Sequence, residues 1–80
     1  MTVGEALRLR ILELCDERNI SVNRLSNISG VTQSTVNNIV SGRNNSATVA
    51  TVKKLCDGLG ITIEEFFRDE LFRDLEQEIR

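Results

Sequence analysis

The strongest indication of the fold comes from the spacing of three residues in the middle of the chain, Ser26, Gly30 and Val36. A small residue such as Ser26 allows two helices to cross closely, and Gly30 permits a sharp turn between them. Val36 follows six residues later, where it can hold the second helix against the first. This spacing is typical of a helix-turn-helix, in which two short helices are joined by a tight turn.

The rest of the chain also favours helices. The 80 residues include no Pro, and alternating strand patterns are rare, so little interrupts the helical periodicity. Five helices are expected, over about residues 4–17, 22–29, 33–41, 47–58 and from 63 onward. Their expected N-caps are Ser21, Thr32, either Ser46 or Thr48, and Thr62, which forms a Thr-x-x-Glu capping box with Glu65.

The apolar residues of these helices define an expected core for one small, all-helical domain. Asn19 is expected to close the first helix in a left-handed conformation, which Asn tolerates. The two Cys residues are expected to be reduced and buried as small apolar side chains. The residues expected to face inward are Leu7, Ile11, Leu14, Cys15, Leu25, Ile28, Val36, Ile39, Val52, Leu55, Cys56 and Leu59.

Several classes of protein are disfavoured by what the sequence lacks. No apolar run reaches the roughly 18–20 residues of a membrane span, and no signal peptide is recognised, so a cytoplasmic protein is expected. Two Cys and no His cannot complete a zinc site, and no metal or other cofactor is expected. Without an imidazole base, a phosphate loop or a nucleophile setting, an enzyme is not expected either.

The stretch from Val31 to Gly42, VTQSTVNNIVSG, has a polar side made of amides and hydroxyls instead of Lys and Glu. At 100° per residue this arc spans about 140° and lies opposite Val36 and Ile39. Carboxamides match adenine edges, and hydroxyls reach bases or phosphates. The alternative is a solvated polar face on a protein-binding bundle. We expect the arc to read DNA bases through Gln33, Ser34, Asn37 and Asn38.

The charges are segregated along the chain. The net charge is −2, but no Asp or Glu occurs from Arg18 to Cys56, whereas the stretch from Asp57 onward holds eight of the twelve acids. The middle of the chain therefore has nothing that would repel phosphate. Chance segregation in a short chain is the alternative, and Arg24, Lys53 and Lys54 taken singly fit a solvated surface equally well.

The segment LSNISGVTQSTVNNIVSG, followed by VKKLCDGLGITIEEFF, resembles the lambda repressor-like helix-turn-helix family (the Cro/CI, or XRE, group) from about Ile11 to Phe67. The resemblance implies a compact five-helix bundle that binds double-stranded DNA. It places Gln33, Ser34 and Asn38 at base-reading positions. It also places four residues near phosphates, and Arg24 is added to this group on charge alone. The residues expected near phosphates are thus Thr32, Thr35, Ser41, Arg43 and Arg24.

Two positions depart from the family pattern. Many members have Gln where this chain has Val22, and that Gln helps to hold a phosphate at the start of the second helix. The Pro that is common before the fourth helix is replaced by the residues NSAT. Val22 cannot make that phosphate contact, and without the Pro the cap of the fourth helix is either Ser46 or Thr48.

The C-terminal segment, residues 68–80, is expected to be an amphipathic helical extension of a DNA-binding domain over residues 1–67, continuous with the fifth helix. Acid–base pairs four residues apart support it, namely Glu64–Arg68, Asp69–Arg73 and Glu76–Arg80. The apolar stripe either folds back on Val3 and Leu7 or forms the seam of a homodimer. It consists of Phe67, Leu71, Phe72, Leu75 and Ile79.

These observations together predict a sequence-specific DNA-binding transcription regulator that acts as a repressor by blocking a promoter. A homodimer is expected, because a two-fold dimer spans two major grooves about 34–36 Å apart. One alternative is the antitoxin of a toxin–antitoxin pair, with the tail as the toxin seat. A second alternative is a helical adaptor that binds a protein partner and no DNA.

Overall fold

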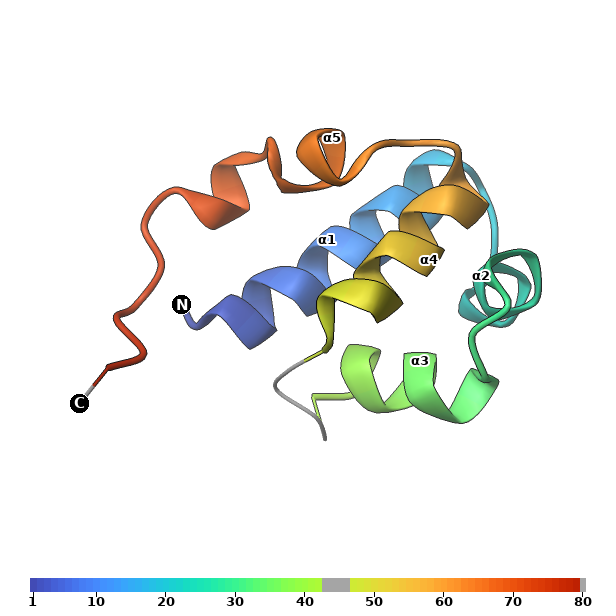
Figure 1. Ribbon diagram of the computed structural model, residues 1–80, viewed down its shortest axis with the longest axis horizontal. Helices are drawn as coiled ribbons and strands as arrows, with labels where there is room; N and C mark the ends of the chain where they lie inside the picture. Colours follow the sequence, from blue (N-terminus) through green and yellow to red (C-terminus); the bar gives the residue numbers. More distant parts are fainter. Residues whose placement is uncertain (43–46, 80) are drawn as a thin grey trace.

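The computed structural model describes residues 1–42 and 47–79, and every regular element in these ranges is helical (Figure 1). The expected all-α fold with five α-helices is confirmed. In the described part of the chain, no helix combines the length and apolar character needed to cross a membrane. The elements are α1 (Val3–Glu17), α2 (Val22–Ser29), α3 (Gln33–Val40), α4 (Val49–Leu59), α5 (Ile63–Phe67) and a 3-10 turn, η1 (Glu70–Phe72).

Each α-helix begins at a hydroxyl side chain that accepts a hydrogen bond from a backbone N–H of the first turn. Ser21, Thr32 and Thr62 are N-caps as predicted, and Thr62 forms the predicted capping box with Glu65. Of the two candidates for α4, Thr48 is the cap, whereas Ser46 lies outside the described residues. The cap of α1 was not predicted: Thr2 forms a second capping box there with Glu5.

The C-terminal ends of three helices are formed by residues in the left-handed conformation. Asn19 has the predicted left-handed conformation, with φ of 54°, and closes α1. Gly30 and Gly60 are left-handed C-caps of α2 and α4, with φ of 67° and 71°. These residues turn the chain sharply, so that α2 packs against α4 and α3, and α1 packs against α3.

The core contains all of the expected residues except Ile28, which is 37% exposed. The reason lies in the neighbours of Ile28 on α2. Leu25 and Ser26 are both buried, so the inward direction of this short helix runs between them, and Ile28 lies about 110° away from it. Cys15 and Cys56 are free, buried thiols, and desolvation raises the pKa of both above the ordinary value.

The expected continuous C-terminal helix is not formed. The helix α5 ends at Phe67, η1 is a single turn, and residues 75–79 have no regular structure. Of the predicted ion pairs, Glu64–Arg68 is formed, but Asp69 pairs with Arg10 instead, and Arg73 lies 3.5 Å from Glu70. The pair Glu76–Arg80 includes a residue outside the described ones.

Arg10 in α1 explains why α5 stops. Its Nε donates to the carbonyl of Phe66 at 2.7 Å, and its Nη2 donates to the carbonyl of Glu65 at 3.0 Å. In a longer helix, these carbonyls would accept from N–H groups four residues later in the chain. With both carbonyls bonded to Arg10, the chain turns, and Phe72 packs against the core. In the expected longer helix, each acid–base pair would have contributed only about 0.2–0.5 kcal/mol of stability.

Candidate nucleic-acid interface

The turn between α2 and α3 is fixed by the three residues whose spacing predicted it. Ser26 is 4% exposed, and its hydroxyl donates to the carbonyl of Val31 at 2.5 Å, which ties the helix to the turn that follows. Gly30 adopts the left-handed conformation, and Val36 is fully buried. The small size of Ser26 is evident from the sequence. Its hydrogen bond across the turn is an addition made by the structure.

The polar arc of α3 is exposed, as a binding face requires. Gln33, Ser34 and Asn37 are exposed, and Asn38 is half-buried. On the opposite side Val36 and Ile39 are 0% and 3% exposed, so they anchor the helix in the core. The structure therefore brings the four expected base-reading residues onto one accessible face with uncharged donors and acceptors.

Thr32 and Thr35 occupy the N-terminal end of this face. The Thr32 hydroxyl accepts the backbone N–H of Thr35, and the two hydroxyl oxygens lie 2.8 Å apart. Because their mutual bond uses one of two hydroxyl protons, the other proton remains available to a phosphate oxygen. Ser41, at the other end of α3, is exposed, and its hydroxyl donates weakly to the carbonyl of Asn38 at 3.4 Å.

The basic residues near this face differ in what they contact. Arg24 is exposed on α2, and its side chain makes no ion pair with any residue in the described ranges. Lys53 is neutralised by Asp57, one turn further along α4. The predicted phosphate contact Arg43 lies outside the described residues. Val22, the departure from the family pattern, packs its side chain against the core and offers no donor.

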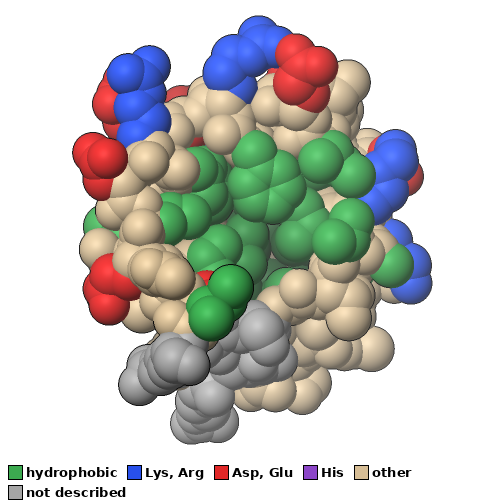
Figure 2. Space-filling model, turned by 60° about the vertical axis from the view of Figure 1, so that its left-hand side comes forward, with side chains coloured by type: hydrophobic (Ala, Val, Ile, Leu, Met, Phe, Trp, Pro, Cys, Tyr) green, Lys and Arg blue, Asp and Glu red, His purple; other side chains and the backbone are tan. Residues whose placement is uncertain are grey.

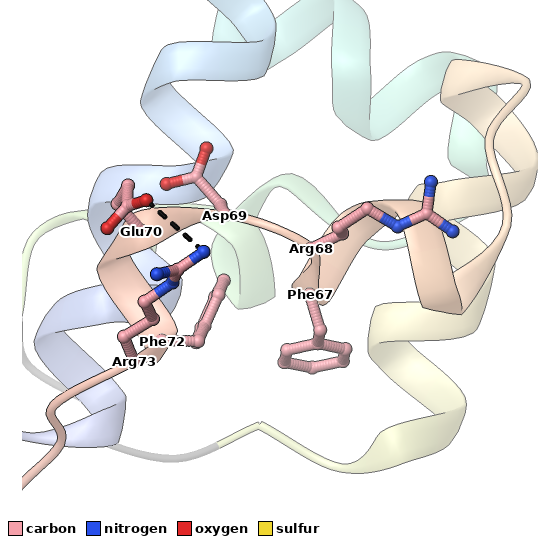
Figure 3. A pocket seen from close by; sticks show the side chains of 6 residues that line it. All are labelled: Phe67, Arg68, Asp69, Glu70, Phe72 and Arg73. Carbon is pink, nitrogen blue, oxygen red and sulfur yellow. Dashed lines mark ion pairs between the residues drawn. The ribbon is translucent and has the colours of Figure 1, made fainter.

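A second surface is formed by the residues of the predicted dimer seam. Figure 2 looks onto the side that bears the tail, where apolar side chains gather centrally and charged ones lie around the edge. Phe67 and Phe72 contact each other edge to face, with ring centroids 4.9 Å apart, in a cleft of about 410 Å³ (Figure 3). Leu71 and Leu75 are half-buried, whereas Ile79 is 80% exposed.

Some residues of the predicted seam fold back on the protein's own core, and others stay exposed. Phe72 folds back onto the core, and the backbone N–H of Glu76 donates to the carbonyl of Met1 at 3.0 Å. Phe67 remains 37% exposed. The apolar residues of the tail thus do not line up along one helix, but Phe67 keeps a surface on which another molecule can pack.

Comparison with known proteins places this geometry in a family. A family model, the Cro/C1-type helix-turn-helix DNA-binding domain, matches residues 10–71. This chain belongs to that family. The crystal structure of prophage Lp1 protein 11 is similar over 94% of this chain and 100% of the other, with 33% sequence identity and a TM-score of 0.80. A comparison with curated proteins gave no match.

Membership of the Cro/C1-type family confirms the resemblance seen in the sequence and shows a DNA-binding domain. The matched range begins at Arg10 in α1 and ends at Leu71 in η1, so it contains the helix-turn-helix and the contacts that stop α5. It reaches slightly beyond the segment Ile11–Phe67 on which the resemblance was based. The roles of individual residues at the DNA remain predictions.

Proposed function

We propose that this protein binds double-stranded DNA sequence-specifically by inserting the polar face of α3 into the major groove. The observation that carries this proposal is the exposed, uncharged arc of α3 backed by the buried Val36 and Ile39. The groove admits an α-helix, and amide side chains on that helix reach the base edges. We infer that the protein is a transcription regulator, a repressor that acts by occupying a promoter.

The base-reading residues are Gln33, Ser34, Asn37 and Asn38. The NH2 group of a carboxamide donates to adenine N7, and its oxygen accepts from the adenine N6 amino group, so Gln and Asn favour adenine. The face carries no Arg or Lys among the described residues of α3, and the usual bidentate contact to guanine is therefore missing. We expect a recognition site that contains A·T pairs at the positions facing these amides.

The phosphate contacts are assigned to Thr32, Thr35 and Ser41 on α3, together with Arg24 and Arg43. Hydroxyls at the two ends of the helix fix its register against the backbone, and the two Arg residues supply charge. Replacing Arg24 with Gln should weaken binding to all sequences alike. It should also lower the slope of log affinity against log salt concentration by about one unit.

The protein acts as a homodimer through the face that contains Phe67. Support comes from the exposed aromatic surface and from its position, since α5 and α3 lie on opposite sides of the bundle in Figure 1. Two copies joined at this face leave both α3 helices accessible. A two-fold dimer would then read two half-sites about one helical turn of DNA apart.

The DNA proposal is tested by selection from a pool of random-sequence duplexes. The wild-type protein should enrich one motif, and the double variant Gln33→Ala/Asn38→Ala should bind it more weakly by about 1–3 kcal/mol for each lost amide–base pair. Gln77→Ala is the matched control, because it removes an exposed carboxamide from the tail. Enrichment of no motif, or equal binding by the double variant, would contradict the proposal.

The dimer proposal is tested by light scattering on the purified protein. Phe67→Glu should reduce the particle mass from that of two chains to that of one. Ile28→Glu is the matched control, since Ile28 and Phe67 have the same exposed fraction, 37%. A wild-type monomer would contradict the dimer, and co-purification of an unrelated small protein would assign the face to a different partner, as in an antitoxin.

A further inference from the structure

Arg8 in α1 forms a polar contact with the last residue of α3. Its Nε donates to the carbonyl of Val40 at 2.8 Å, across 32 residues of sequence, and the side chain is partly buried. This hydrogen bond joins α1 directly to the C-terminal end of α3, the helix that carries the polar arc. Nothing in the local sequence around Arg8 distinguishes it from a solvated Arg.

The hydrogen bonds at the end of α3 show why this contact matters. The last four carbonyls of a helix have no partner within the helix itself. Here the carbonyls of residues 37 and 39 accept from the backbone N–H groups of Ser41 and Gly42, and that of residue 38 accepts from the Ser41 hydroxyl. Among the described residues, a distant side chain, that of Arg8, bonds the carbonyl of Val40.

The charge of Arg8 has a second effect at the same place. The C-terminal end of a helix carries partial negative charge, and a cation there is favourable. The last turn of α3 contains no basic residue. Arg8 therefore supplies both a donor and a positive charge to the end of α3, and it does so from the fifteen-residue α1.

We propose that Arg8 is a positioning residue for DNA recognition, which acts through the Val40 carbonyl to set where Asn37, Asn38 and Ser41 lie against the bases. This inference rests on the proposed function. Base reading depends on side chains being held to within about 0.5 Å, whereas binding to phosphates tolerates looser geometry. Loss of Arg8 should thus reduce discrimination between sequences more than it reduces binding to DNA in general.

The test compares Arg8→Met with Arg8→Lys. Met preserves an apolar stem as far as the position of Nε but removes the donor and the charge, whereas Lys keeps a donor and the charge. Lys54→Met is the matched control, because Lys54 is an exposed cation on α4. Affinity is measured for the duplex motif selected by the wild-type protein and for a random duplex, over a range of salt concentrations. Exchange of the Gly42 and Ser41 amides with solvent is followed by NMR.

Arg8→Met should lower affinity for the selected motif by about tenfold, which corresponds to about 1.4 kcal/mol, with little change for the random duplex. The salt slope should stay the same, the Ser41 and Gly42 amides should exchange faster, and Arg8→Lys should recover part of the loss. Lys54→Met should leave the ratio of the two affinities unchanged.

Two results would overturn this inference while leaving the proposed function intact. An equal loss on both duplexes with a salt slope lower by about one unit would make Arg8 a direct phosphate contact. An unchanged ratio of affinities would make its role purely structural. Failure of the wild-type protein to select any motif would instead contradict the proposed function, and the positioning role for Arg8 with it.

Discussion

The α2–α3 pair and the segment from α5 to η1 are held in place by different kinds of contact. Ser21 and Thr32 cap their own helices, and the Ser26 hydroxyl bonds to a carbonyl only five residues away. The α5–η1 segment depends instead on Arg10, whose partners Phe66 and Asp69 are more than fifty residues distant in sequence. The turn between α2 and α3 is thus fixed by local contacts, whereas the end of α5 and η1 are joined to α1 by a distant side chain.

The two regions also present different surfaces. The described residues of α3 expose amides and hydroxyls without charge, which suits contact with base edges. The α5–η1 segment exposes an aromatic cleft between Phe67 and Phe72, with Arg and acidic residues at its rim. The comparison teaches that local contacts form the turn in front of the polar face of α3, while a tertiary contact positions the aromatic cleft. The predictions below test this distinction, in order of decreasing effect.

Arg10→Met should have the largest effect on stability. It removes the buried donor to the Phe66 carbonyl, one of two donors to the Glu65 carbonyl, and the partner of Asp69. The free energy of unfolding, measured in urea, should fall by about 2–4 kcal/mol. Arg24→Met, which changes an exposed Arg, should have little effect. A similar stability for both variants would show that α5–η1 is not held by Arg10.

Gly58→Ala should have the next largest effect, and it tests how closely α4 supports α2. An added Cβ would overlap the Oγ of Ser29 and lie 3.0 Å from its Cα. Gly to Ala within a helix normally adds about 0.5–1 kcal/mol of stability. Here overpacking should lower the free energy of unfolding by about 1–3 kcal/mol.

The control for this variant is Ser29→Ala. The Ser29 hydroxyl is buried without a hydrogen-bond partner in the described part of the chain, so its removal should not reduce stability. In combination with Gly58→Ala, it should recover part of the loss, but not all, because the backbone contact at 3.0 Å remains. Strictly additive effects in the double variant would refute a direct contact between the two sites.

Ser21→Ala tests the local side of the comparison. The Ser21 hydroxyl accepts from the N–H of Arg24 at 3.0 Å and starts α2. Its loss should lower the free energy of unfolding by about 1 kcal/mol. Asn23→Ala, an exposed change in the same helix turn, should stay within about 0.5 kcal/mol of the wild type. Equal effects of the two substitutions would mean that the cap does not hold the helix.

The smallest effect concerns pH and the capping box of α5. The backbone N–H of Thr62 donates to the Glu65 carboxylate, and this bond is the main reason that the pKa of Glu65 is lowered in the folded state. The Thr62 side chain lowers the pKa further. A lowered folded pKa gives stability that is present above the unfolded pKa and is lost as the pH falls through the folded pKa. The thermal midpoint of Glu65→Gln should therefore change less than that of the wild type between neutral and acidic pH. An identical change in both proteins would contradict this.

The sequence predicted the locally determined parts of the fold best. Caps such as Thr32 and turn residues such as Gly30 act on their own neighbourhood, so their effects can be read from a few adjacent residues. The periodicity of the tail was equally clear, but its few tenths of a kcal/mol per ion pair are outweighed by the contacts of Arg10 and the burial of Phe72. Those contacts depend on the fold, and no local pattern contains them.

In the candidate site, too, the features set by local sequence could be predicted and those set by tertiary contacts could not. Gln33, Ser34 and Asn37 could be placed on an exposed face because helical periodicity alone fixes which way they point. The contact of Arg8 with Val40 could not be foreseen, because it requires knowledge of how α1 crosses α3. Ile28 was misplaced for a related reason, since the inward direction of α2 depends on the burial of the polar Ser26.

The most direct test of the central claim is an NMR titration of the isotope-labelled protein with the duplex that it selects. The side-chain amide signals of Gln33, Asn37 and Asn38 should shift and show contacts to base protons in the major groove, while the signals of residues 74–79 remain nearly unchanged. If the shifts instead lie on α5 and η1, and the amides of α3 stay as they are in the free protein, α3 is not the helix that reads DNA.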